Sequence, residues 1–159
     1  MVVIVGIWFF KNSGNDIPEQ VRLTDNEDFI LETTIIDLEN LTSYGIPIII
    51  DFGADSCIPC KEMAPVLETL NEEMQGIAII KFVDVWKNVN AAADFPIQVI
   101  PTQVFINADG KPYLPGEDID IEFLMFKNRA TDELVFTVHQ GGLTEEQMRA
   151  ILKDMEVEN

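Results

Sequence analysis

The two cysteines of the chain, Cys57 and Cys60, enclose Ile58 and Pro59 in a Cys-Ile-Pro-Cys motif. The motif follows an apolar run, Pro47–Phe52, and opens a segment with helical periodicity. Free N–H groups and the positive dipole end at a helix start stabilise a thiolate. A bridge over two intervening residues closes a small ring and adds little loop-closure stabilisation. The placement therefore indicates thiol–disulfide exchange rather than a structural crosslink.

Half of a zinc site is the alternative interpretation of the cysteine pair. Zinc takes four ligands, and besides carboxylates the chain offers only His139 to complete the set. The redox interpretation is therefore favoured. It requires neither a metal nor an organic cofactor, because the dithiol is itself the redox group.

Four residues in and around the motif are candidates for supporting roles. Asp51 interrupts an apolar run six residues before Cys57. In a central strand its carboxyl would be buried, and burial raises a carboxyl pKa and suits it to accept a proton from a thiol. Lys81, in the next predicted strand, is a candidate partner for Asp51. The alternatives are an Asp51 at the solvent end of its strand and a surface Lys81.

Pro59 suits a first helical turn, where its missing N–H would be unpaired anyway. Ile58 is expected to shape contacts.

The elements that must position these residues follow from hydrophobic periodicity. The apolar run Ile46–Phe52 is typical of a central strand covered on both faces. The segment Lys61–Met74 has the apolar spacing of an amphipathic helix, which Pro65 should kink. Further strands are expected at Asp28–Thr34, Ile77–Val85, Thr102–Ile106, Glu122–Phe126 and Leu134–Val138. Further helices are expected at Ile35–Tyr44 and Val89–Phe95. A last helix is expected to begin with a capping box formed by Thr144 and Gln147. This order predicts an α/β fold whose mixed sheet has helices on both faces.

Composition bounds the class of protein. The 159 residues suffice for one domain with a well-formed core, and 47% of them are hydrophobic. The net charge of −18 argues against nucleic-acid binding and disfavours docking to an anionic membrane. A well-solvated acidic surface is sufficient to explain this charge. The more specific alternative is that the charge steers a basic partner toward the protein.

The first twenty residues form an apolar segment and a polar linker. Met1–Phe10 is uncharged and apolar, about half the length of a membrane span, and lacks the basic start of a signal peptide. This segment is either the outer end of a membrane anchor or a strand added to the sheet. The expected division is residues 1–20 and a folded domain over 21–159. An anchor would make the protein membrane-tethered and extracytoplasmic, and the alternative is a cytoplasmic location.

Three stretches carry a resemblance to the thioredoxin family. The first is Ile48–Leu67, which reads IIIDFGADSCIPCKEMAPVL; the others are Ile100–Thr102 and Gly141–Thr144. They occur in the family's order, and the resemblance extends over about Asp28–Met155. A Cys-x-x-Cys pair beside a βαβ pattern is itself a recognised redox motif.

The resemblance implies a role for each site residue. Cys57 is the exposed nucleophile that attacks a substrate disulfide, and Cys60 is the more buried thiol that resolves the mixed disulfide. Asp51 is the acid behind Cys60. The Ile100–Pro101 bond is implied to be cis and to face the dithiol, leaving the Ile100 backbone free to pair with an extended substrate. Without the resemblance, an ordinary trans proline opening a strand would be expected.

The chain departs from the family pattern at several positions. Gly53 and Ser56 stand where thioredoxins usually have tryptophans, and Ile58 where many have glycine. The segment Tyr113–Glu133 is longer than in a minimal thioredoxin, with an extended loop and hairpin before the last helix. These changes leave the dithiol chemistry intact and bear on the redox potential and the docking surface.

The expected function is that of a monomeric thiol–disulfide oxidoreductase that reduces protein disulfides and serves cell redox homeostasis and electron transport. Its electrons would come from an upstream thiol reductant. That donor is either thioredoxin reductase or a membrane thiol carrier, as in relatives that serve cytochrome c biogenesis. The alternatives are a disulfide oxidant and a binding module that presents Tyr113–Glu133, with the dithiol incidental.

Overall fold

The computed structural model of the chain describes residues 26–157. The segment over residues 1–20, expected as an anchor remnant or an added strand, lies outside this range. Among the described residues, no helix combines the length and the apolar character that crossing a membrane requires.

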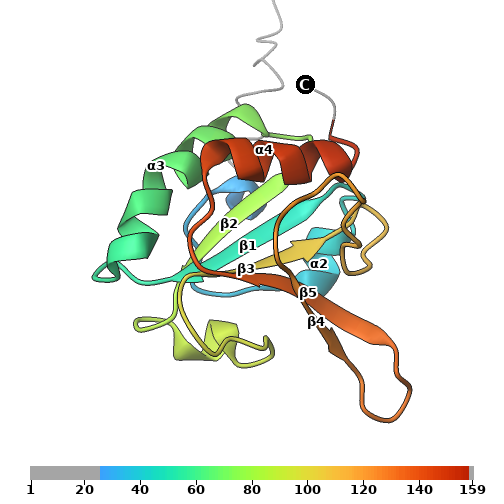
Figure 1. The fold of residues 1–159 in the computed structure, drawn as a ribbon. Coiled ribbons are helices and arrows are strands. Elements are labelled where there is room, and N and C mark those ends of the chain that lie inside the picture. Colours follow the sequence, from blue (N-terminus) through green and yellow to red (C-terminus); the bar gives the residue numbers. More distant parts are fainter. Residues whose placement is uncertain (1–25, 158–159) are drawn as a thin grey trace, which may run out of the picture.

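A five-stranded mixed sheet forms the centre of the molecule, in the spatial order β2-β1-β3-β5-β4 (Figure 1). β1 pairs with β2 in parallel, and the pairs β1–β3, β3–β5 and β4–β5 are antiparallel. The strand bounds are β1 Ile48–Gly53, β2 Ile79–Asp84, β3 Thr102–Ile106, β4 Leu124–Lys127 and β5 Leu134–Gln140. The predicted α/β class and the mixed sheet are confirmed.

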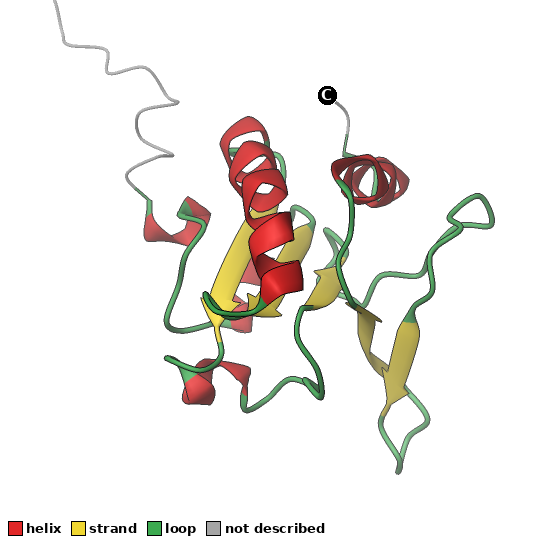
Figure 2. Ribbon diagram, turned by 60° about the vertical axis from the view of Figure 1, so that its left-hand side comes forward, coloured by secondary structure: helices red, strands yellow, loops and turns green. Residues whose placement is uncertain are grey.

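Helices cover both faces of this sheet (Figures 1 and 2). On one face lie α3 (Ile58–Glu73) and α4 (Glu145–Asp154), and on the other lie α2 (Leu38–Thr42) and the 3-10 helix η2 (Val89–Ala92). β1 is buried along its whole length because both of its faces are covered. Its apolar side chains alternate between the two cores, with Ile49 toward α3 and Ile48, Ile50 and Phe52 toward α2.

The strand predicted at Asp28–Thr34 is wrong. The structure has a 3-10 helix, η1 (Glu27–Phe29), followed by a single bridge between Glu32 and Phe82. The Asn26 side chain accepts a hydrogen bond from the backbone N–H of Asp28 and so caps a turn where the strand was expected.

Two predicted helices are shorter than expected. The helix predicted over Ile35–Tyr44 is confined to α2, because Asp37 caps it by accepting a hydrogen bond from the Asn40 N–H. The helix predicted to run to Phe95 is only the short η2.

The helices α3 and α4 follow the sequence more closely. α3 begins at Ile58, three residues earlier than predicted, and continues through Pro65. The capping box predicted for α4 is confirmed, with Thr144 and Gln147 each bonding the other's backbone N–H.

The long segment before β5 is tied to α4. The Tyr113 hydroxyl is buried and donates to Asp154 Oδ2 at 2.5 Å, and the Gly116 N–H donates to the same oxygen at 2.9 Å. Burial, together with the Asp154 carboxylate, raises the pKa of Tyr113. The segment then forms β4, which lies at the end of the sheet beside β5 (Figure 1).

Candidate active site

The cysteine pair lies at the N-terminus of α3, joined as a disulfide with a Cα–Cα distance of 5.2 Å. Cys57 is the N-cap residue, and its Sγ accepts a hydrogen bond from the Cys60 N–H at 3.3 Å. Cys57 is half-buried, whereas Cys60 is only 4% exposed. One sulfur is therefore reachable at a helix start, where a thiolate is stabilised, and the other is covered.

Close packing surrounds the buried sulfur. A Cβ added at Gly53 would lie 3.1 Å from Cys60 Sγ and 2.9 Å from Phe82 Cε2. Only glycine lets β1 end this close to the sulfur without a shift of these neighbours. Gly53 departs from the family pattern, which usually has tryptophan at this position. The steric reason for glycine here is seen only in the structure.

The two residues between the cysteines lie at the surface of the first turn. Ile58 is 72% exposed, and Pro59 occupies a position where its missing N–H leaves no partner unsatisfied. Ile58 thus offers an apolar contact beside the reachable sulfur.

Asp84 anchors the loop before the motif and was not singled out from the sequence. Its buried carboxylate accepts hydrogen bonds from the backbone N–H groups of Asp55, Trp86 and Lys87. Burial acts to raise the pKa of Asp84, but these three donors outweigh it and the pKa is lowered. The carboxylate holds the loop after β1 against the turn after β2.

Asp51 is fully buried in β1, on the face that α3 and α4 cover. Burial raises the pKa of its carboxyl to about 7, and the hydrogen bond from Gln103 opposes this rise. Oδ1 accepts that bond at 2.7 Å, whereas Oδ2 has no partner among the described residues. The expected burial of Asp51 in a central strand is confirmed, and the alternative of a position at the solvent end of the strand is wrong.

Gln103 is, with Asp84, a residue near the motif that was not singled out from the sequence. It lies opposite Asp51 in the β1–β3 ladder, fully buried, and its Nε2 donates to Asp51 Oδ1 and to the Gly141 carbonyl oxygen at 3.1 Å. Nε2 also lies 3.4 Å from the Met63 sulfur, one turn along α3 from the buried cysteine. The available signal was an amide inside the apolar run Thr102–Ile106.

Lys81 is not the partner of Asp51. It pairs with Ile50 in the ladder, whereas Asp51 pairs with Phe82, so Lys81 points to the opposite face of the sheet. Its Nζ donates to the carbonyl oxygens of Glu27 and Ile30, at 2.7 and 2.8 Å. It is not a surface lysine either, since it is 3% exposed and burial lowers its pKa.

The Ile100–Pro101 peptide is cis, as the resemblance implies. The Pro101 carbonyl accepts a hydrogen bond from the Gly141 N–H at 2.9 Å. Gly141 has a φ of 110°, a conformation that favours glycine. The backbone of Gly141 thus forms hydrogen bonds with both the Pro101 carbonyl and the Gln103 side chain. Within the described residues, Ile100 makes no backbone hydrogen bond.

Metal-ligating side chains do not gather in the described part of the chain: no group of three or more His, Cys, Asp or Glu residues could hold an ion there. His139 Nδ1 lies 2.8 Å from the Glu122 carbonyl oxygen.

Comparison with known proteins agrees with the fold. The thioredoxin family profile matches residues 38–117. A thioredoxin of Borreliella burgdorferi is 33% identical over 96 residues, which are 58% of this chain and 80% of the relative. A thioredoxin of Staphylococcus aureus is 37% identical over 83 residues, 52% of this chain and 78% of the relative.

Solved structures give the same result. Fasciola hepatica thioredoxin superposes with a TM-score of 0.53 at 28% identity, over 78% of this chain and 97% of that structure. A mutant thioredoxin from Halobacterium salinarum gives a TM-score of 0.55 at 25% identity, over 81% and 91%.

The mixed sheet and the cysteine pair at a helix start thus define a thiol–disulfide oxidoreductase, a protein-disulfide reductase. The chain belongs to the thioredoxin family. Members of this family need no cofactor beyond their redox-active dithiol.

Proposed function

We propose that Cys57 and Cys60 are the dithiol through which this chain reduces protein disulfides. The observation that carries the proposal is their unequal exposure at the start of α3. The Cys57 thiolate attacks one sulfur of the substrate disulfide, and the other substrate sulfur leaves as a thiolate. The Cys60 thiolate then attacks Cys57 Sγ and releases the second substrate thiolate. The substrate gains two electrons, and the protein ends as the Cys57–Cys60 disulfide.

Asp51 is the proposed proton acceptor for Cys60 in the second step. It lies two residues before Gly53, whose backbone packs against the buried sulfur, and on the face of β1 that α3 covers. A pKa of about 7 lets the carboxylate take the thiol proton and return it to solvent near neutral pH. Gln103 is a positioning residue, because its amide fixes the carboxylate and donates to it.

The Ile100–Pro101 segment is proposed to receive the substrate chain. Ile100 makes no backbone hydrogen bond among the described residues, and Val99 beside it is an exposed apolar side chain. An extended substrate segment would pair with the free backbone groups of Ile100 and contact Val99 and Ile58.

The proposed electron donor is a thioredoxin reductase or a membrane thiol carrier, and the protein acts as a monomer. A membrane carrier would place it in an extracytoplasmic electron-transport route such as cytochrome c maturation. A reductase would place it in the cytoplasm. Assays of the purified protein with each donor distinguish the two, since only the true donor should sustain multiple turnovers.

Insulin reduction and a redox titration in glutathione buffers test the proposal. The account predicts turnover that is lost in Cys57→Ser, and a potential well below that of the glutathione pool. A potential well above that pool would make the protein an oxidant. Turnover unaffected by Cys57→Ser would exclude the dithiol, and absence of any turnover would favour a binding module.

A further inference from the structure

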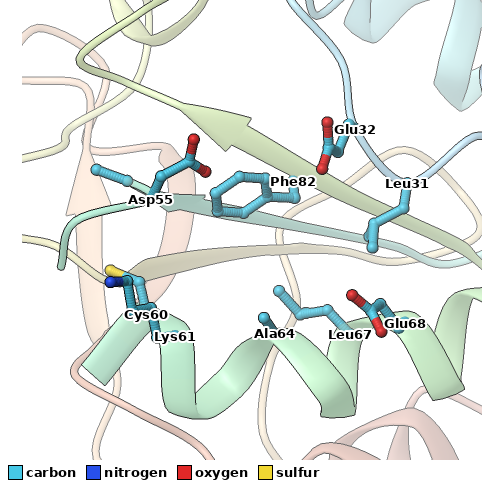
Figure 3. A pocket seen from close by; sticks show the side chains of 10 residues that line it. Leu31, Glu32, Asp55, Cys60, Lys61, Ala64, Leu67, Glu68 and Phe82 are labelled. Carbon is cyan, nitrogen blue, oxygen red and sulfur yellow. The ribbon is translucent and has the colours of Figure 1, made fainter. Parts of the chain in front are cut away.

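An acidic groove surrounds Phe82 at the edge of the sheet. It consists of two adjoining hollows, of about 300 Å³ and about 450 Å³, which share Glu32, Asp55 and Phe82 in their walls. The first hollow lies between α3 and the segment that bridges to β2 (Figure 3). The acidic groove is separate from the backbone that is proposed to pair with substrate, because neither hollow is lined by Ile100 or Pro101.

The floor of this acidic groove is apolar and reaches the dithiol. Leu31, Leu67 and the half-buried ring of Phe82 line it, and Cys60 lines its end (Figure 3). Since Cys60 is bonded to Cys57, a protein held at the reachable sulfur has this floor beside it.

The walls of the acidic groove are strongly negative. Five carboxylates line its two hollows: Glu27, Glu32, Asp55, Glu68 and Asp84. The cations there are Lys61 and Lys87, and Lys87 is already paired with Asp55 and Asp84. Glu32 and Glu68 extend from opposite sides of the first hollow and make no ion pair within residues 26–157 (Figure 3).

We propose that this acidic groove receives an arginine side chain of the disulfide-bearing protein substrate, next to the disulfide being reduced. The methylene stem fits the floor of Leu31 and Leu67, and the planar guanidinium stacks on Phe82. Its charge is neutralised by Glu32 and Glu68. The inference rests on the proposed function and adds a substrate class, namely proteins with arginine near their reducible disulfide. The net charge of −18 favours such basic partners over long range.

Two peptides that each carry one disulfide test this inference. One has arginines on both flanks of the disulfide, and the other has glutamines at the same positions. We expect the reduced protein to react with the arginine peptide about threefold to tenfold faster, measured as kcat/KM, because ion pairs and a cation–π contact contribute modestly. The ratio should approach one in the double variant Glu32→Gln/Glu68→Gln, and should fall between about 0.05 and 0.5 M NaCl.

Glu62→Gln is the matched control. Like the Glu68→Gln half of the double variant, it removes one negative charge from α3, but closer to the dithiol and outside the acidic groove, and it should keep the preference for arginine. Phe82→Leu should lower the preference while retaining an apolar floor. Equal rates for both peptides with the wild-type protein would overturn the inference, as would an equal loss in Glu62→Gln.

A redox-independent measurement separates this inference from the proposed function. In NMR titrations of the full chain with peptides whose cysteines are replaced by serine, only the arginine peptide should shift the amide resonances of Leu31, Glu32 and Phe82. If neither disulfide peptide nor insulin is reduced, the proposed function fails. The NMR shifts still show whether the acidic groove binds arginine. Shifts that are absent, or the same for both peptides, contradict arginine as the occupant.

Discussion

Asp51 and Gln103 face each other across the β1–β3 ladder, and the amide of Gln103 donates to the carboxylate at 2.7 Å. Both side chains are fully buried, and Oδ2 of Asp51 and Oε1 of Gln103 have no partner among residues 26–157. A neutral amide stabilises a buried carboxylate less than a cation would, since it contributes a dipole rather than a full charge. The hydrogen bond from Gln103 therefore offsets only part of the effect of burial, and the pKa of Asp51 stays raised, at about 7.

The buried carboxyl of Asp51 should make stability depend on pH. Its pKa rises from 3.8 to about 7 on folding. Below the lower value both states are protonated. Between the two values the unfolded state is ionised while the folded state keeps its proton, so stability falls as pH rises, and the loss is complete above the folded pKa. We expect oxidised Asp51→Asn to match the wild type at about pH 3 and to exceed it by up to about 4 kcal/mol at about pH 8. Urea unfolding at a series of pH values measures this difference, and a pH-independent difference would contradict it.

Gln103→Leu should shift the pH dependence of the reaction. Removing the amide donor raises the pKa of Asp51 further, because a hydrogen bond to the charged form is lost. The midpoint of the pH–rate profile for release of a mixed disulfide should move upward by about one pH unit. Stopped-flow measurement of this release gives the midpoint.

Thr137→Val is the control for that experiment. Thr137 is fully buried in β5 and donates to the Tyr113 carbonyl oxygen at 2.6 Å, and it makes no hydrogen bond to the Asp51 side chain. It should lose a comparable amount of stability while keeping the wild-type midpoint. Equal midpoints in Gln103→Leu and the wild type would assign Gln103 a structural role only.

Gly53→Ala should disturb the buried sulfur. The added Cβ would lie 2.9 Å from Phe82 Cε2 and 3.1 Å from Cys60 Sγ, so that one of these must move. We expect a loss of about 1–3 kcal/mol in stability and a slower resolving step. In Gly142→Ala, by contrast, the nearest atom is Met63 Cγ at 3.9 Å, which is ordinary contact. Thermal unfolding of both variants checks the prediction, which fails if the two behave alike.

The sequence predicted the cysteine pair at a helix start and most of the sheet because both depend on local signals. The cysteine spacing, the helix start and the apolar run of β1 are read directly from the chain, as is the carboxyl that interrupts that run. The cis bond before Pro101 came only through the family resemblance.

The errors concern what register and tertiary packing decide. Whether Lys81 faces Asp51 depends on the β1–β2 pairing, and a shift of one residue would exchange the two faces. Gln103 was missed for the same reason. It faces Asp51 only because the antiparallel register of β1 and β3 places these two residues opposite each other. The predicted strand at Asp28–Thr34 failed because a side-chain cap at Asn26 outweighed weak alternation.

The nucleophilic role of Cys57 is tested most directly by trapping the mixed disulfide. Reduced Cys60→Ser is incubated with a disulfide-bearing peptide, digested under non-reducing conditions, and analysed by mass spectrometry. We expect a stable peptide adduct on Cys57, because the resolving thiol is absent, and no comparable adduct on Cys60 in Cys57→Ser. Adducts that form equally well on either cysteine, or on neither, would contradict it.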